Sequence, residues 1–235
     1  IRIQSNDTQC VVLDEIGINI LPPPNLTTPE PLEVCDYHAD IYDGIGEFNL
    51  DNASYQNLDR IQTIVVHYFE NFNDINHDDA LDNSRAITNP TNYISGSKTI
   101  YIKITNTITE CYTTLPLELI VNEPPRPNHI GTVAVCDNGT NSQDLSFIEA
   151  MLLSNPMDFD FDYFADSNFN SLLSDKVLNY ATAGDYSIYV RITNKLTLCN
   201  ITTSFVSRIK ETPVANAPVN LVECDDDYDG MYSFD

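Results

Sequence analysis

The feature that most constrains the fold of this chain is an internal repeat. Residues 99–111 read TIYIKITNTITEC and residues 187–199 read SIYVRITNKLTLC, so the two segments align position by position at an offset of 88. The first ten residues carry a shorter third copy, which ends at Cys10. Self-similarity at a fixed period is the signature of repeat architectures, in which one structural unit is used several times. The sequence therefore predicts an array of related units.

A second motif follows each copy at a constant distance. It centres on Cys35, Cys136 and Cys224, and each of these cysteines lies 25 residues after the cysteine that ends the preceding copy. The joints between the units are rich in proline, which favours short, semi-rigid spacers. We expect a piece of a longer protein with the end of one repeat in residues 1–21, complete repeats in residues 22–122 and 123–211, and the start of another in residues 212–235.

Alternating residues identify strands within each unit. Ile100, Ile102 and Ile104 alternate with polar or amphipathic residues, which is the period-two pattern of a half-buried strand. Residues 158–163 alternate aspartate with aromatic residues, so one face is expected to be buried and the other wet. In the first complete repeat, the strand that contains Ile100, Ile102 and Ile104 is followed by a Thr-Asn turn and a second strand over residues 112–121. This order predicts a hairpin.

These short strands favour an all-β fold of tandem immunoglobulin-like β-sandwich repeats. Residues 146–153 break the pattern with helical spacing, and residues 52–61 are the matching segment of the first repeat. We therefore expect a short helix in one inter-strand connection of each repeat.

The cysteines occupy regular positions of the repeat and none forms a CxxC pair, which predicts disulfides and an oxidising compartment. They are Cys10, Cys35, Cys111, Cys136, Cys199 and Cys224. Pairing within repeats gives Cys35–Cys111 and Cys136–Cys199, and leaves the outer two cysteines for partners beyond the chain. Pairing across the joints gives Cys10–Cys35, Cys111–Cys136 and Cys199–Cys224. The constant spacing favours the second scheme, but an extended joint would hold those sulfurs apart, so we expect the first.

The charge of the chain excludes several function classes. Eleven basic residues face 35 acidic ones, for a formal net charge of −24, and such a field repels nucleic acids and anionic membranes. No apolar run is long enough to span a bilayer, so direct membrane insertion is not expected. The sequence also lacks the hydrolase, zinc-protease and phosphate-loop motifs, so we expect that the protein is not an enzyme.

Acidic residues at alternating positions predict Ca²⁺ as a cofactor. Asp225, Asp227 and Asp229 precede Gly230, a spacing that lets a turning backbone point carboxylate oxygens inward. The copy in the first complete repeat is less regular and consists of Asp36, Asp40 and Asp43 before Gly44. The alternative interpretation is that both segments are solvated acidic turns.

The motifs together resemble a known family. Cys-Asp-Asp-Asp-x-Asp-Gly over residues 224–230, Tyr-Phe-Glu over residues 68–70 and the Thr-Ile-Tyr-Ile motif at residue 99 are similar to the tandem repeats of large Bacteroidetes (flavobacterial) cell-surface proteins. These are exported by type IX secretion and include gliding-motility and adhesion proteins. The resemblance implies an extracellular location on a bacterial cell surface, as part of an adhesin stalk or filament.

Two functions fit these features. In the first, the repeats are structural and contact only neighbouring repeats of the same chain, stiffened by disulfides and calcium. In the second, each sandwich is a ligand-binding module of a secreted multidomain protein, and its loops contact surface glycans or other cell-surface proteins.

Overall fold

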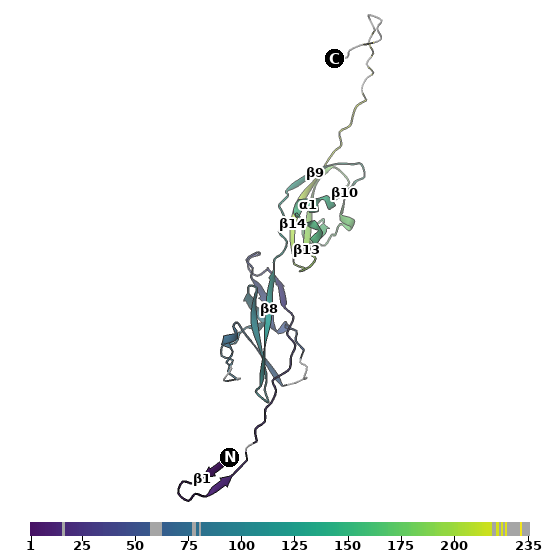
Figure 1. Cartoon of the computed structure of the whole chain (residues 1–235). Helices are drawn as coiled ribbons and strands as arrows, with labels where there is room; N and C mark the ends of the chain where they lie inside the picture. Colours follow the sequence, from purple (N-terminus) through teal and green to yellow (C-terminus); the bar gives the residue numbers. More distant parts are fainter. Residues whose placement is uncertain are drawn as a thin grey trace. The chain divides into compact units, whose positions relative to one another are not determined.

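The structure of the chain, a computed structural model, describes residues 1–15, 17–56, 63–76, 79, 81–217, 220, 222, 224 and 231 (Figure 1). It divides into two units. Unit 1 comprises Ile1–Pro125 and Thr193–Ile201, and unit 2 comprises Arg126–Ile192 and Thr202–Asp235. No helix among these described residues is both long and apolar enough to cross a membrane.

Unit 1 is built from short strands and single turns of 3₁₀ helix. Its strands are β1 (Arg2–Gln4), β2 (Val11–Leu13), β3 (Leu32–Cys35), β4 (Gly46–Phe48), β5 (Ile64–Phe69), β6 (Tyr93–Ser95), β7 (Lys98–Asn106) and β8 (Tyr112–Asn122). Its 3₁₀ turns are η1 (Leu50–Asn52), η2 (Phe72–Asp74) and η3 (Pro90–Asn92). Strands β3, β8, β7 and β5 form a four-stranded sheet in that order, β4 pairs with β6, and β1 pairs with β2.

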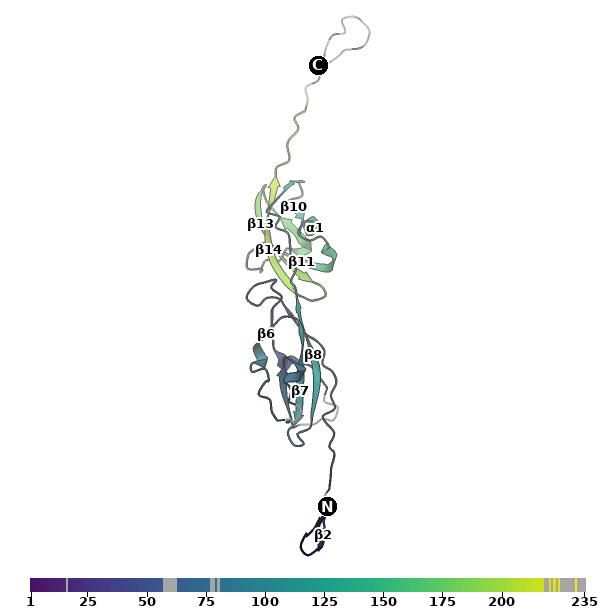
Figure 2. The same cartoon turned by 60° about the vertical axis from the view of Figure 1, so that its left-hand side comes forward.

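The core of unit 1 follows the alternation of the sequence. Ile100, Ile102 and Ile104 of β7 are fully buried and pack with Phe48 and Leu50, which lie on β4 and η1. Strands β7 and β8 form the predicted antiparallel hairpin (Figure 2). Strand β3 runs parallel to β8 within the four-stranded sheet. That sheet and the β4–β6 pair both contribute apolar side chains to this core, in the manner of a sandwich.

Unit 2 repeats this topology. Its strands are β9 (Thr132–Cys136), β10 (Ser142–Asp144), β11 (Phe159–Phe164), β12 (Val177–Asn179), β13 (Gly184–Asn194) and β14 (Asn200–Lys210). Helix α1 (Glu149–Leu152) and the turns η4 (Ser146–Ile148), η5 (Pro156–Asp158) and η6 (Ser174–Lys176) connect them. The four-stranded sheet has the order β11-β13-β14-β9, and β10 pairs with β12, so each strand has a counterpart in unit 1.

The predicted fold class is confirmed: the chain is an all-β tandem of immunoglobulin-like sandwiches with one short α-helix among the described residues. That helix, together with η4, covers the segment that was expected to be helical in the second repeat. In the first repeat Ala53–Gln56 is not helical, and the residues that follow, up to Ile61, lie outside the described part of the chain. The exact limits of the repeats stay a prediction.

Candidate functional site

The best-defined site is a disulfide between two strand ends that are distant in sequence. Cys35 is the last residue of β3, and the parallel pairing of β3 with β8 places it opposite Asn122. The amide of Asp36 donates to the carbonyl of Asn122 at 3.0 Å, and the side-chain amide of Asn122 donates to Glu33 at 2.8 Å. Hydrogen bonds that link Glu33 and Asp36, on either side of Cys35, to Asn122 therefore hold this strand end in place.

The second cysteine lies in the turn that joins β13 to β14. Asn194 opens this turn: its backbone amide donates to the carbonyl of Cys199 at 2.9 Å, and its side-chain Oδ1 accepts from the amide of Leu196 at 2.9 Å. Leu198 adopts a left-handed backbone conformation with φ of 60°, which turns the chain back toward β14. Cys199 is fully buried. The turn thus presents one sulfur from a backbone that is closed by its own hydrogen bonds.

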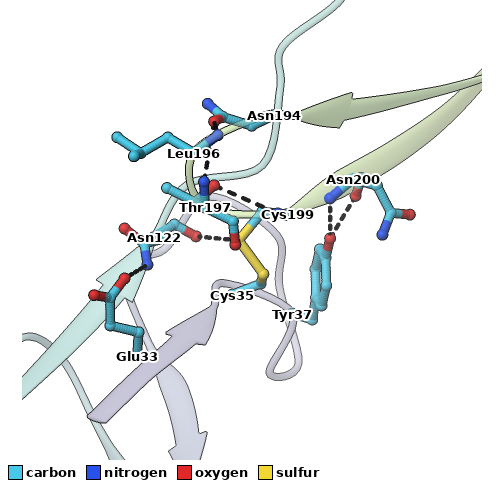
Figure 3. The surroundings of a disulfide bond; sticks show 9 residues. All are labelled: Glu33, Cys35, Tyr37, Asn122, Asn194, Leu196, Thr197, Cys199 and Asn200. Atoms are coloured by element: carbon cyan, nitrogen blue, oxygen red, sulfur yellow. Dashed lines mark hydrogen bonds between the residues drawn. A yellow bond between two sulfur atoms is a disulfide. The ribbon is translucent and has the colours of Figure 1, made fainter. Parts of the chain in front are cut away.

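Figure 3 shows the bond that these two cysteines form. The Cα atoms of Cys35 and Cys199 lie 5.6 Å apart, within the usual range for a disulfide, and the two residues are separated by 164 positions in sequence. Residues Thr193–Ile201 group with unit 1, although β13 and β14 otherwise belong to the sheet of unit 2. The disulfide therefore holds the turn of one sandwich's main hairpin at the end of the other sandwich's first strand.

Tyr37 reinforces the same junction. Its hydroxyl donates to the carbonyl of Asn200 at 2.5 Å and accepts from the amide of Asn200 at 2.6 Å. Cys199 Sγ also lies 3.7 Å from the carbonyl oxygen of Asn122. The covalent bond is thus accompanied by a pair of hydrogen bonds to the backbone of β14 (Figure 3).

Both predicted pairing schemes are wrong, because Cys35 and Cys199 bond to each other. Cys35–Cys111 is impossible for a geometric reason: Cys35 lies opposite the last residue of β8, whereas Cys111 precedes its first residue. An eleven-residue strand is about 36 Å long, far beyond the reach of a disulfide. The same argument excludes Cys136–Cys199, since Cys136 pairs with Lys210 at the far end of β14.

The scheme that pairs cysteines across the joints is excluded for another reason, because Cys10, Cys111, Cys136 and Cys224 are unpaired. Its three bonds would have been Cys10–Cys35, Cys111–Cys136 and Cys199–Cys224.

Two of the unpaired cysteines reproduce the setting of the bonded ones. Cys111 Sγ lies 3.6 Å from the carbonyl oxygen of Leu21, and Cys199 Sγ lies 3.7 Å from that of Asn122. The two settings correspond, because Leu21 is the eleventh residue after Cys10 and Asn122 is the eleventh residue after Cys111. At the other end, Cys136 pairs with Lys210 as Cys35 pairs with Asn122. The signal was in the sequence, because the hairpin and strand cysteines form two separate series, but neither predicted scheme paired the first-strand cysteine of one repeat with the hairpin cysteine of the following repeat.

Among the described residues, the structure does not bring the predicted calcium ligands Asp36, Asp40 and Asp43 together. Asp36 is buried, and its Oδ2 accepts from the amide of Gly44 at 2.9 Å, while Oδ1 has no partner among the described residues. Asp43 accepts from the amide of Ile45, and Asp40 is exposed. Within the described residues no group of three or more histidine, cysteine or acidic side chains is placed to hold a metal ion. Asp225, Asp227 and Asp229 lie outside the described residues, so calcium at either copy stays a prediction.

Comparison with known proteins bears on the disulfide. Residues 31–125 match the family described as the Flavobacterium inter-domain disulphide bond domain. This stretch contains Cys35, one of the two bonded cysteines, and is similar to that flavobacterial domain. The match covers less than half of the chain. No curated protein sequence matches the chain.

Several solved structures are similar to the chain at a distance. An I-band fragment of titin, I67–I69, is 10% identical with a TM-score of 0.34, over 82% of this chain and 67% of the titin chain. Extracellular domains 3–5 of Drosophila OTK are 9% identical with a TM-score of 0.33, over 87% of this chain and 68% of that one. Likenesses this distant carry no argument about function.

Proposed function

We propose that the chain is a non-enzymatic structural segment of a long extracellular bacterial surface protein, an adhesin or filament, in which a disulfide ties each repeat to the next. The observation that carries this proposal is the Cys35–Cys199 bond, which joins the first strand of one sandwich to the hairpin of the following one. A tie of this kind limits how far successive units can be pulled apart. That property suits a protein that transmits force away from a cell.

The unpaired cysteines support extension of the same tie along an array. Cys111 presents its sulfur beside the carbonyl of Leu21, where the first-strand cysteine of a preceding repeat would lie. Cys136 is exposed at the end of β9, where the hairpin cysteine of a following repeat would reach it. Disulfides persist in oxidising compartments, so this series of bonds favours an extracellular location.

The bond also contributes to stability. In the chain-entropy model, closing a loop of 164 residues restricts the unfolded chain by about 5 kcal/mol.

A single-molecule pulling experiment on the whole chain, held at its two ends, tests the tie. While the bond is intact, the 164 residues that it encloses cannot extend, so complete unfolding should release about 570 Å less length than in the reduced protein. Cys199→Ser should give the longer value without reductant. Cys111→Ser, the matched hairpin variant, should behave as the wild type.

A peptide map without reduction gives the chemical control. It should contain one peptide that links Cys35 to Cys199. A Cys35–Cys111 or Cys136–Cys199 peptide, or an unfolding length that reductant does not change, would contradict the proposal. The location is tested separately: antibodies to the chain should label intact cells of the native host, and labelling only after lysis would exclude a surface role.

A further inference from the structure

Unit 2 carries a groove that differs in chemistry from the rest of this acidic chain. Two adjoining hollows, of about 260 and 340 Å³, share His129, Tyr189 and Ser204. We call them together the Tyr189 groove. Its side chains that matter for binding are His129, Phe169, Ser187, Tyr189, Thr202 and Ser204.

The groove has no charged lining. No aspartate, glutamate, lysine or arginine is among the described residues that line it, although the chain carries 35 acidic and 11 basic residues. A hollow of about 500 Å³ in unit 1 is different, because Glu70, Asp74 and Arg85 line it. A charged ligand would therefore find no counter-charge in the Tyr189 groove, and the overall negative field would repel an anionic one.

Aromatic rings form one wall. Tyr189 lies between the buried residues Ile188 and Val190 of β13, so its ring projects from the opposite face of the sheet. The ring of Phe169 stands edge-on to it at 76°, with the centroids 6.2 Å apart, and edge-on to Phe164 at 78° and 5.2 Å. Half-buried rings of this kind offer apolar surface to a ligand.

The loop that carries Phe169 is preformed. The carboxylate of Asp166 accepts from the amides of Asn168 at 2.9 Å and Ser171 at 2.6 Å, which closes the loop on itself. Phe169 lies within it at φ of 57°, a left-handed conformation that costs a bulky residue on the order of 1 kcal/mol. The loop therefore holds the ring against Tyr189 at a cost in backbone strain, which is typical of positions kept for a purpose other than stability.

Polar groups with free hydrogen-bonding capacity surround the rings. Within the described part of the chain, the side chains of His129, Ser187, Tyr189, Thr202 and Ser204 make no hydrogen bond to the protein. Each hydroxyl can donate one hydrogen bond and accept others. The groove thus combines apolar ring surface with several hydroxyl groups that make no hydrogen bond within the described structure and are open to a ligand.

We propose that the Tyr189 groove binds a neutral saccharide. A sugar ring presents an apolar C–H face, which packs on an aromatic ring, and a rim of hydroxyls, which pair with serine, threonine and tyrosine. The size agrees, since the two hollows together lie within the usual range for small-molecule sites. A protein partner would instead need about 800 Å² of surface. This inference concerns unit 2 and is independent of the disulfide tie.

The test is a calorimetric titration of the oxidised chain with neutral hexose oligomers, namely maltohexaose, cellohexaose, laminarihexaose and mannohexaose. Trigalacturonate serves as the charged counterpart. At least one neutral oligomer should bind, and trigalacturonate should not. Tyr189→Ala should weaken that binding by about tenfold or more, a loss of at least 1.4 kcal/mol.

Tyr101→Ala is the matched control, because Tyr101 occupies the same repeat position in unit 1 and pairs edge-on with Phe72, but does not line the hollow of unit 1 beside Glu70 and Arg85. It should leave binding unchanged. Ser204→Asp keeps the proposal testable if Tyr189→Ala fails to fold, since Ser204 is exposed and a carboxylate there should abolish binding. Absence of binding by all four oligomers, equal binding of trigalacturonate, or binding unaffected by both groove variants would overturn it.

Discussion

At the scale of single residues, the two repeats place a cation at the same position but surround it differently. Arg191 of β13 pairs with Asp162 at 2.7 Å and lies over the ring of Phe164. Its counterpart Lys103 is fully buried, lies over the rings of Phe69 and Tyr112, and donates to the carbonyl of Asp82 at 3.4 Å.

The residue opposite Lys103 does not compensate its charge. His67 faces Lys103 across β5 and β7, and its Nδ1 has no hydrogen-bond partner in the described structure. Burial lowers the pKa of His67, and the nearby ammonium lowers it further. Burial also lowers the pKa of Lys103, although Asp82 and Asp79 act in the opposite direction. Among the described residues of unit 1, this buried cation therefore has no side-chain anion in contact.

This arrangement predicts a dependence of stability on pH. Because the folded-state pKa of Lys103 lies below 10.5, the unfolded chain binds more protons than the folded chain in the interval between the two values. The free energy of unfolding should therefore rise with pH across that interval and level off above it. Lys103→Met should remove this rise and stabilise the protein at pH 7 by about 1–2 kcal/mol, since an apolar isostere avoids desolvation of the charge.

Denaturant unfolding at a series of pH values measures both effects. Lys98→Met is the control, because Lys98 pairs with Glu70 at 3.1 Å at the surface, and this variant should keep the rise. A Lys103→Met protein that is less stable than the wild type at pH 7 would show that the contacts with Phe69 and Tyr112 outweigh the cost of burying the charge.

At the scale of elements, the hairpin turn is the most faithfully repeated feature of the chain. Ser5, Asn106 and Asn194 open the three copies, and the backbone amide of each donates to the carbonyl of the cysteine five residues later at 2.9 Å. The residue before each cysteine is left-handed, with φ of 57° at Gln9, 61° at Glu110 and 60° at Leu198. None of these is glycine or asparagine, so each turn holds a residue that disfavours its conformation.

Relief of that conformation should stabilise the turn. Leu198→Asn should raise the free energy of unfolding by about 0.5–1 kcal/mol, because asparagine tolerates the left-handed region and Leu198 is 70% exposed, so little packing is lost. Denaturant midpoints of the oxidised protein give the comparison. Leu196→Asn is the control: Leu196 is also exposed but is not left-handed, and no gain is expected. Equal effects of both variants would count against the argument.

At the scale of the whole molecule, the net charge of −24 makes the chain a candidate for divalent cations. We expect calcium binding at Asp225, Asp227 and Asp229, which should stabilise the chain by about 2.7 kcal/mol at a concentration one hundred times the dissociation constant. Calorimetry and thermal unfolding with and without calcium measure this, with sodium chloride at matched ionic strength to separate binding from screening.

Variants distinguish the two predicted copies. Asp227→Asn should abolish the calorimetric heat if the C-terminal copy binds the ion. Asp43→Asn should leave it unchanged, since Asp43 accepts a hydrogen bond from the amide of Ile45 and does not converge with Asp36 and Asp40. No heat on titration of the wild-type chain would exclude calcium as a cofactor.

Much of the fold could be predicted because its signals are local. The alternation of Ile100, Ile102 and Ile104 predicted both the strand and its buried face, and the helical spacing of residues 146–153 predicted α1 and η4. The site was less accessible. Asn194 and Leu198 define the turn geometrically, but no sequence pattern indicates that Tyr37 contacts the backbone of Asn200, which lies 163 positions away.

The sequence by itself determined that the chain is a tandem of sandwiches with cysteines in register, because repeat period and strand alternation are properties of short segments. Only the tertiary structure decided which cysteines bond. A disulfide depends on where strand ends meet in space, and the parallel pairing of β3 with β8 places Cys35 at the end away from Cys111. The Tyr189 groove is an intermediate case: Tyr189 and Ser204 lie on a hairpin of the kind that the repeat predicted, but only the tertiary structure places His129 and Phe169 beside them.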